Sequence, residues 1–190
     1  MNKPFEFNIG KSEMKRGLKG EAIVEAFLKQ KGYEVKDMRD DWECRKKDID
    51  FLATKDGKTI SIEAKSSSTA ADTGILPVED ILNCNIGLKG WIWYCHADLL
   101  MVSSKNKIFI YEPAQMRHYL MSVEEERAKL VVDYSDIFNP KTNMNELDKR
   151  LLPEARTMTD AANDDTPSKV IHVPFADYIS LGYYGQIIEL

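Results

Sequence analysis

The chain has 190 residues, 43% of them hydrophobic, so it is long enough to bury one substantial core, with room for a small appended lobe. No apolar run approaches the ~18 residues needed to cross a bilayer, and the first residues lack the apolar stretch of a secretory signal. We therefore expect a globular, cytoplasmic protein with no membrane partner. The three cysteines form no CxxC pair, which argues against a disulfide framework or a cysteine-rich zinc site.

The net charge of −5 is unevenly distributed. Residues 1–65 hold 15 Lys and Arg against 13 Asp and Glu, a net of +2, whereas residues 66–190 hold 11 against 18, a net of −7. Basic side chains in the first part could supply phosphate contacts to a nucleic acid, although such groups are more often a solvated face. The candidates are Lys15, Arg16, Lys19, Lys46 and Lys47.

The first expected element is a helix over about residues 12–31, where apolar residues recur at helical spacing and Gly32 follows as a stop. Residues 33–35 indicate a short strand and residues 36–47 a charged loop. The next segment indicates a hairpin, with strands at 49–53 and 59–65 joined by an Asp-Gly turn.

Alternation along the second hairpin strand separates two faces, because successive strand side chains point to opposite sides. Ile60, Ile62 and Ala64 point one way, which predicts the core face. Glu63 and Lys65 point the other way together with Ser61. A strand with a Glu-x-Lys face is usually only an exposed sheet edge, so its position beside Asp50 is what matters.

The remaining elements complete an α/β domain with a mixed sheet flanked by helices. We expect a loop at 66–74, a helix at 78–88, strands at 91–94, 99–103 and 107–111, and a helix at 112–121. Residues 122–166 are acidic and without clear period, and late strands follow at 169–173 and 187–188. The predicted core is thus 1–121, with an irregular acidic C-terminal extension, 122–190, packed on the same domain.

Asp50, Glu63 and Lys65 together indicate phosphodiester chemistry. Hydrolysis of a phosphodiester needs charge neutralised at phosphorus and a water deprotonated near neutral pH, and a divalent ion does both. Asp50 and Glu63 would supply carboxylate ligands for Mg²⁺ or Mn²⁺. Lys65 would orient the attacking water or stabilise the developing charge. Asp48 could compete with Asp50 for the metal role, and we favour Asp50.

The ordered set of these features resembles the PD-(D/E)XK nuclease superfamily, most closely the archaeal Holliday junction resolvase type. Gly20-Glu21 and Gly32-Tyr33 match its first helix, Asp50-Phe51-Leu52-Ala53 its Asp strand, and Ile62-Glu63-Ala64-Lys65-Ser66 its Glu-x-Lys strand. The match covers residues 17–66, with Ile49 where the motif has Pro. The resemblance implies a restriction endonuclease-like core, a main-chain carbonyl ligand from Ala64, and a second-ion or water contact from Glu21.

The functions left open fall into different classes. The leading expectation is a Mg²⁺-dependent DNA endonuclease, with branched or structured DNA as an analogy only; a restriction-type enzyme is the second. Either would be expected to act as a homodimer, and the acidic 122–166 stretch could bind a protein partner. A catalytically silent nucleic-acid-binding module, or an α/β domain that binds a small molecule or protein, remains the non-enzymatic alternative.

Other residues carry weaker functional signals. Ser67 could contact a phosphate if the strand continued past Lys65, although serine runs are more often loop. His96 and Asp98 could suggest a general base but more often occupy a turn. His118 and His172 show no metal-ligand spacing. The tryptophans Trp42, Trp91 and Trp93 could stack on bases, although strand tryptophans usually fill cores.

Overall fold

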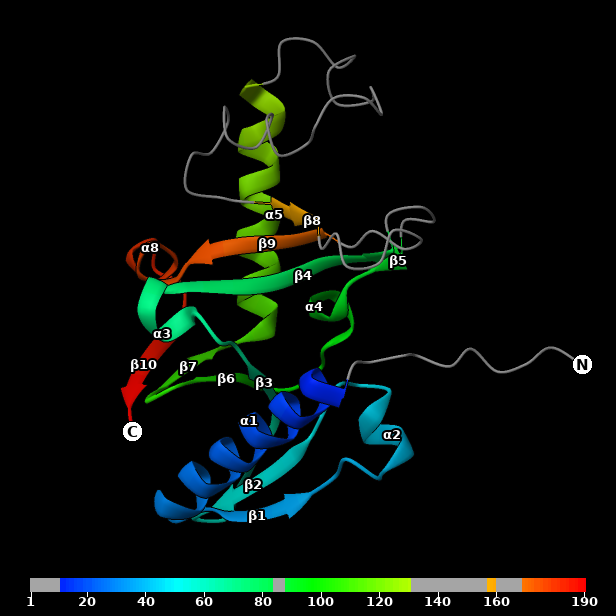
Figure 1. Ribbon diagram of the computed structural model, residues 1–190, viewed down its shortest axis with the longest axis vertical. Coiled ribbons are helices and arrows are strands. Elements are labelled where there is room, and N and C mark those ends of the chain that lie inside the picture. Colours follow the sequence, from blue (N-terminus) through cyan, green and yellow to red (C-terminus); the bar gives the residue numbers. More distant parts are fainter. Residues whose placement is uncertain (1–10, 84–87, 131–156, 160–168) are drawn as a thin grey trace, which may run out of the picture.

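A six-stranded mixed sheet forms the centre of the protein, for which the computed structural model describes residues 11–83, 88–130, 157–159 and 169–190 (Figure 1). Its strand order is β1-β2-β3-β6-β7-β10. The bounds are β1 (Glu34–Asp37), β2 (Phe51–Lys55), β3 (Lys58–Ser66), β6 (Leu99–Ser104), β7 (Lys107–Tyr111) and β10 (Gly185–Glu189). Among the described strands, only β3 and β6 pair in parallel, so a crossover connection must join them.

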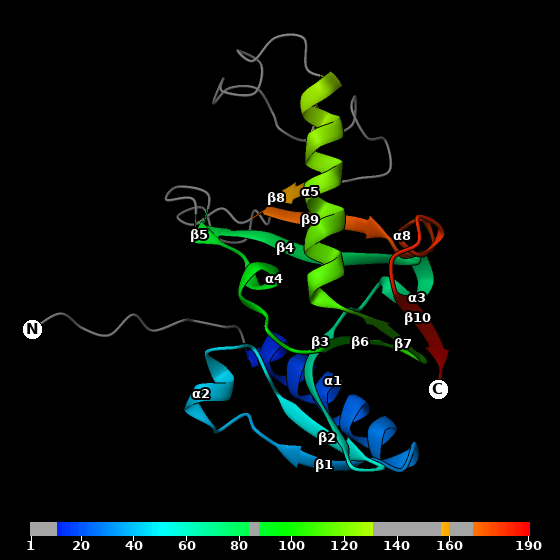
Figure 2. The same ribbon diagram turned by 180° about the vertical axis from the view of Figure 1, so that it is seen from behind.

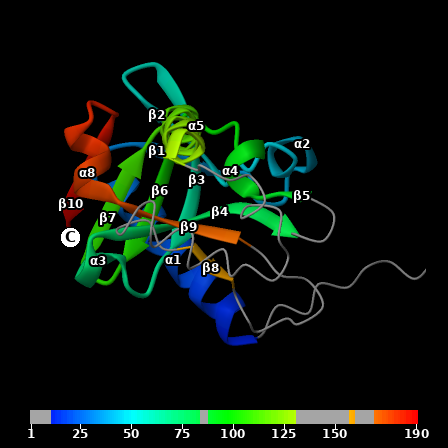
Figure 3. The same ribbon diagram turned by 90° about the horizontal axis from the view of Figure 1, so that it is seen from above.

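A second, antiparallel sheet is built partly from that crossover. Its order is β5-β4-β9-β8, with β4 (Ile75–Asn83), β5 (Leu88–Lys89), β8 (Thr157–Thr159) and β9 (Lys169–Pro174). The long pairing of β4 with β9 joins segments almost 100 residues apart, since Ile75 lies opposite Pro174. Figure 3 shows β4 and β9 running side by side.

Helices cover both faces of the six-stranded sheet. The helices in the described residues are α1 (Lys11–Gln30), α2 (Trp42–Arg45), α3 (Ala70–Thr73), α4 (Trp91–Tyr94), α5 (Pro113–Leu130) and α8 (Phe175–Ser180). Figures 1 and 2 show α1 along one face, and α5 with the second sheet on the other. Two buried clusters correspond to these faces, one around Val24 and Leu28 of α1 and one around Leu100, Tyr111 and Val78.

The predicted hairpin and its alternation are confirmed. Asp56 and Gly57 both have positive φ, 51° and 73°, which is the geometry of a two-residue hairpin turn. Ile62 and Ala64 lie in the α1-facing cluster. Glu63 and Lys65 therefore point to the opposite face, where Glu63 is buried and Lys65, 35% exposed, lies against the Trp91 ring of α4.

The long helix over 12–31 and the strands at 99–103 and 107–111 are confirmed, and the helix predicted at 112–121 extends to Leu130. Two predictions in the crossover are wrong. Residues 78–88 were expected to be helical but belong mainly to β4, and Trp91–Tyr94, expected as a strand, forms α4. Two loops also hold short helices, α2 within 36–47 and α3 within 66–74.

Most of the acidic excursion predicted at 122–166 lies outside the described residues. Within its described part, α5 continues to Leu130 and β8 pairs with β9. The late strands at 169–173 and 187–188 are confirmed as β9 and β10. In the part of the chain that the structure describes, no helix is both long and apolar enough to cross a membrane.

Candidate active site

Asp50 is anchored to the middle of the sheet at the start of β2. Its main-chain N–H donates to the carbonyl of Ile62 at 2.9 Å, which continues the β2–β3 ladder. Its Oδ2 accepts a hydrogen bond from the N–H of Ala64, also at 2.9 Å. Asp50 is therefore held against the Glu-x-Lys segment by contacts from both its backbone and its side chain.

Glu63 and Lys65 form an ion pair, with Lys65 Nζ 2.5 Å from Glu63 Oε1. The Glu63 side chain is only 5% exposed. Burial raises the pKa of Glu63 to about 8; Lys65 opposes the shift and Asp50 adds to it. Burial would lower the pKa of Lys65, but the surrounding carboxylates of Glu63, Asp48 and Asp50 reverse this and the pKa is raised.

The carboxyl groups of Asp50 and Glu63 are close neighbours. The pKa of Asp50 is raised by burial, while the Ala64 N–H, Lys65 and a side-chain hydrogen bond with Glu63 lower it. Glu21 raises the same pKa, so its carboxylate also acts on Asp50. Two of the carboxylates predicted for the site, those of Glu63 and Glu21, thus lie within electrostatic reach of Asp50.

Asp48 lies on the same charged side. It has a positive φ of 49°, so the chain bends sharply just before β2. Burial raises the pKa of Asp48, and Lys65 and His96 lower it. Asp48 is therefore a neighbour of Lys65, and the structure leaves it as a second acidic candidate beside Asp50.

Glu79 of β4 is a site residue that the sequence did not reveal. Its pKa is raised by burial, and it interacts electrostatically with Lys65 and Asp48. Its Oε1 accepts from the N–H of Trp91 at 3.3 Å, and the Trp91 ring lies 5.3 Å from Lys65 Nζ. Glu79 was hidden because its segment was assigned to a helix, and no local motif marks it.

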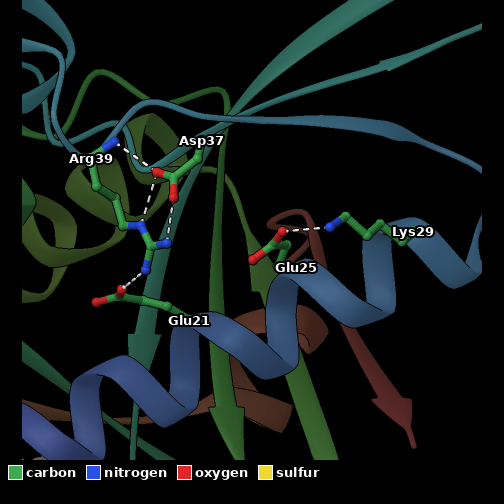
Figure 4. Close-up of polar contacts among 5 residues, drawn as sticks. All are labelled: Glu21, Glu25, Lys29, Asp37 and Arg39. Carbon is green, nitrogen blue, oxygen red and sulfur yellow. Dashed lines mark hydrogen bonds and ion pairs between the residues drawn. The ribbon is translucent and has the colours of Figure 1, made fainter.

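Glu21 extends from α1 toward the loop after β1 rather than standing free (Figure 4). Arg39 donates to Glu21 Oε2 at 2.5 Å, and its Nε donates to Asp37 Oδ1 at 2.9 Å. Hydrogen bonds from Arg39 lower the pKa of Asp37 to about 2. Arg39 therefore links Glu21 to β1, a role that the sequence gave no signal for.

Gly20, immediately before Glu21, explains how α1 reaches the sheet so closely. A Cβ at this position would lie 2.6 Å from Ser66 Cβ and 2.8 Å from Ser103 Oγ. Only glycine allows this approach. Beside it lies a hollow of about 280 Å³ lined by Lys19, Gly20, Ile23, Ser66, Ser67, Ser68, Ser103 and Lys105.

The predicted nucleic-acid contacts fall into three groups. Lys19, Lys46 and Lys47 are exposed. Lys15 and Arg16 lie in α1, but their side chains are outside the described part of the structure. Ser67 is buried, and its Oγ accepts from the N–H groups of Thr69 and Ala70 at 3.3 and 3.1 Å, so its hydroxyl already supports the start of α3.

Asp98 and the cysteines, which the sequence did not assign to the site, differ in their contacts and burial. Asp98 accepts from the N–H and the hydroxyl of Ser61, both at 2.8 Å. Cys95 is buried, and burial raises its pKa to about 12. Cys44 is partly exposed and Cys84 lies outside the described residues.

The donor set was tested for a divalent ion. Among the described residues, no group of three or more His, Cys, Asp or Glu is arranged to hold a metal ion. Mg²⁺, however, commonly uses one or two carboxylates and completes its shell with water and phosphate. Asp50 and Glu63 meet that smaller requirement: they are adjacent, Glu63 is buried and Asp50 is partly buried, and the charge of Asp50 raises the pKa of Glu63, an effect that a bound cation would offset.

Comparison of the chain with protein-family models, with curated proteins and with solved structures finds no match. The functional interpretation therefore depends on the site itself.

Proposed function

We propose that the protein is a Mg²⁺- or Mn²⁺-dependent endonuclease that hydrolyses DNA phosphodiester bonds, with Asp50, Glu63 and Lys65 at its active site. The observation that carries this proposal is their convergence. Asp50 bonds to Ala64, between the other two residues, and Lys65 lies 2.5 Å from a nearly buried Glu63. Burying charged groups is unfavourable, and buried ionisable groups with shifted pKa values cluster at functional sites.

The order of elements supports a restriction endonuclease-like core. A helix bearing Glu21 is followed by a strand that begins after Asp50, a tight hairpin, and the strand with Glu63 and Lys65. This is the order on which the resemblance to PD-(D/E)XK nucleases rests. The crossover between β3 and β6 then adds Glu79 and Trp91 around the same lysine.

Each side chain has a distinct role in this proposal. Asp50 and Glu63, with the Ala64 carbonyl, would hold the ion, which supplies positive charge at the phosphate and makes water easier to deprotonate. Lys65 would leave Glu63 and orient the attacking water or stabilise the developing negative charge. Glu21, held by Arg39, would contribute a further carboxylate on the α1 side.

A catalytically silent DNA-binding module is the second candidate. One observation favours it: the ion pair with Lys65 already neutralises Glu63. Such a protein would bind DNA in the same place without cutting it.

Cleavage assays separate the two. Linear duplex, single-stranded and four-way-junction DNA are incubated with the protein, with and without Mg²⁺ or Mn²⁺. A nuclease gives metal-dependent products that disappear in Lys65→Ala and Asp50→Asn. DNA binding without products under any condition would support the silent module instead.

A further inference from the structure

Trp42 is an exposed aromatic side chain on an ordered turn. It opens α2 and is 66% exposed, which is unusual for tryptophan. The turn is well fixed: Asp41 Oδ1 accepts from the Cys44 N–H at 2.9 Å, and the Arg45 N–H donates to the Asp41 carbonyl at 2.9 Å. The indole is therefore presented to solvent by a capped helical turn and not by a frayed end.

One cation lies over the indole, and further cations lie in the same segment of the chain. Lys46 Nζ lies 4.9 Å from the Trp42 ring centroid. Its ion pair with Glu43, at 3.1 Å, is exposed and so holds it only weakly. Three further cations in this segment are exposed and form no ion pair within the described residues: Lys36, Arg45 and Lys47.

Two of the carboxylates in this segment have partners within the protein. Asp37 is paired with Arg39, and Asp41 caps the helix. Asp40 and Glu43 are exposed, so the surface that α2 offers to a ligand is an aromatic face with the Lys46 ammonium against it and charges of both signs in the same segment.

The turn leads directly into the candidate active site. The N–H of Ile49 donates to the Cys44 carbonyl at 3.1 Å, and the N–H of His96 donates to the Lys47 carbonyl at 2.8 Å. α2 is therefore tied to the segment that carries Asp48 and Asp50. Figure 1 shows α2 in the connection between β1 and β2.

We infer that Trp42 stacks on an unpaired nucleobase, while Lys46, Lys47 and Arg45 contact the flanking phosphates, so the preferred ligand is DNA with a single-stranded part next to the cleavage site. This inference rests on the proposed nuclease function. An aromatic platform inside a basic surface is the combination that binds single strands, because each base offers a π face and each nucleotide a phosphate. In an intact duplex, neighbouring pairs cover those faces. A protein partner would not need the exposed Lys36, Arg45 and Lys47 in the segment that carries the ring.

Binding is measured without divalent metal, so that nothing is cut, by the fluorescence anisotropy of labelled oligothymidine, of blunt duplex, and of duplex with a single-stranded extension. Trp42→Ala is expected to weaken binding of the first and third ligands about tenfold, as removal of one stacked base does. The affinity of Trp42→Ala for blunt duplex stays within about twofold of wild type, because phosphate contacts dominate the binding of an intact duplex. Trp42→Phe retains most of the affinity.

Controls separate stacking from general effects. Leu181→Ala removes an equally exposed apolar side chain, 66% exposed on another element, and leaves binding unchanged. Lys47→Gln weakens the binding of all three ligands and reduces the slope of log affinity against log salt concentration by about one. Trp42→Ala leaves that slope unchanged.

The inference would be overturned if Trp42→Ala lost affinity equally for blunt duplex and single strand, or lost no affinity for either. The proposed function has a different point of failure. If wild type cuts DNA with metal while Trp42→Ala binds normally, only the inference fails; if wild type neither binds nor cuts any DNA, both fail.

Discussion

The β2–β3 hairpin and the β4–α4 crossover both contribute to the candidate site, but in opposite ways. The hairpin carries Asp50, Glu63 and Lys65, and its structure follows from local signals: alternation and an Asp-Gly turn. The crossover carries Glu79 and Trp91, and its structure follows from distant partners, since β4 pairs with β9 near the other end of the chain. Local pattern thus specifies the reactive groups, while long-range pairing builds their surroundings.

The hairpin's role is tested most strongly by Lys65→Ala. If Lys65 is the catalytic lysine, metal-dependent DNA cleavage falls by about 10³-fold or more, because charge stabilisation at the phosphate is lost. The matched control is Lys58→Ala, which removes an exposed lysine at the other end of the same strand. Cleavage by Lys58→Ala stays within about twofold of wild type. Comparable activity in both variants would remove Lys65 from the site.

The crossover's role is tested by Gly90→Ala. A Cβ at Gly90 would lie 2.3 Å from the carbonyl oxygen of Glu79, so α4 must move away from β4. We expect a loss of about 2–3 kcal/mol in the free energy of unfolding, as overpacking typically causes. Urea denaturation measures it. Gly17→Ala is the control. A Cβ at Gly17 in α1 would lie 4.0 Å from its nearest neighbour, so the free energy of unfolding of this variant should be unchanged or increased.

Glu63→Gln tests the electrostatic cost that burial imposes at the hairpin. The pKa of Glu63 is raised from 4.5 to about 8, so the folded protein holds this proton more tightly than the unfolded chain does. The proton therefore contributes its full share to the free energy of unfolding below pH 4.5, and this contribution is lost as the pH rises through 8. Without metal, wild type should therefore lose roughly 1–3 kcal/mol relative to Glu63→Gln between pH 5 and pH 8.

Thermal unfolding of both proteins across this pH range measures the difference in stability. A difference that does not change with pH contradicts the raised pKa of Glu63. Mg²⁺ should restore wild-type stability more at pH 8 than at pH 6, because the ion binds the deprotonated carboxylate.

Arg39→Gln produces the smallest of these effects. Losing the guanidinium frees Glu21 from β1, and we expect roughly a tenfold fall in metal-dependent cleavage with less than about 1 kcal/mol change in stability, since the pair is partly exposed. Lys29→Gln is the control, because it breaks an exposed ion pair with Glu25 on the same helix (Figure 4). Its cleavage rate should match wild type. Equal effects of the two variants would assign Arg39 a merely structural role.

The sequence by itself determined the hairpin, the long first helix and the existence of strands β6 and β7, since hydrophobic period and turn residues act over a few neighbours. It also placed Asp50 beside Glu63 and Lys65, because the Asp-Gly turn sets the register. Only the tertiary structure decided that Glu63 on the charged face of β3 is buried, that Trp91–Tyr94 forms a helix, and that Glu79 and Arg39 join the site. Those outcomes depend on contacts between segments far apart in the chain, and no local pattern encodes which distant segments will meet.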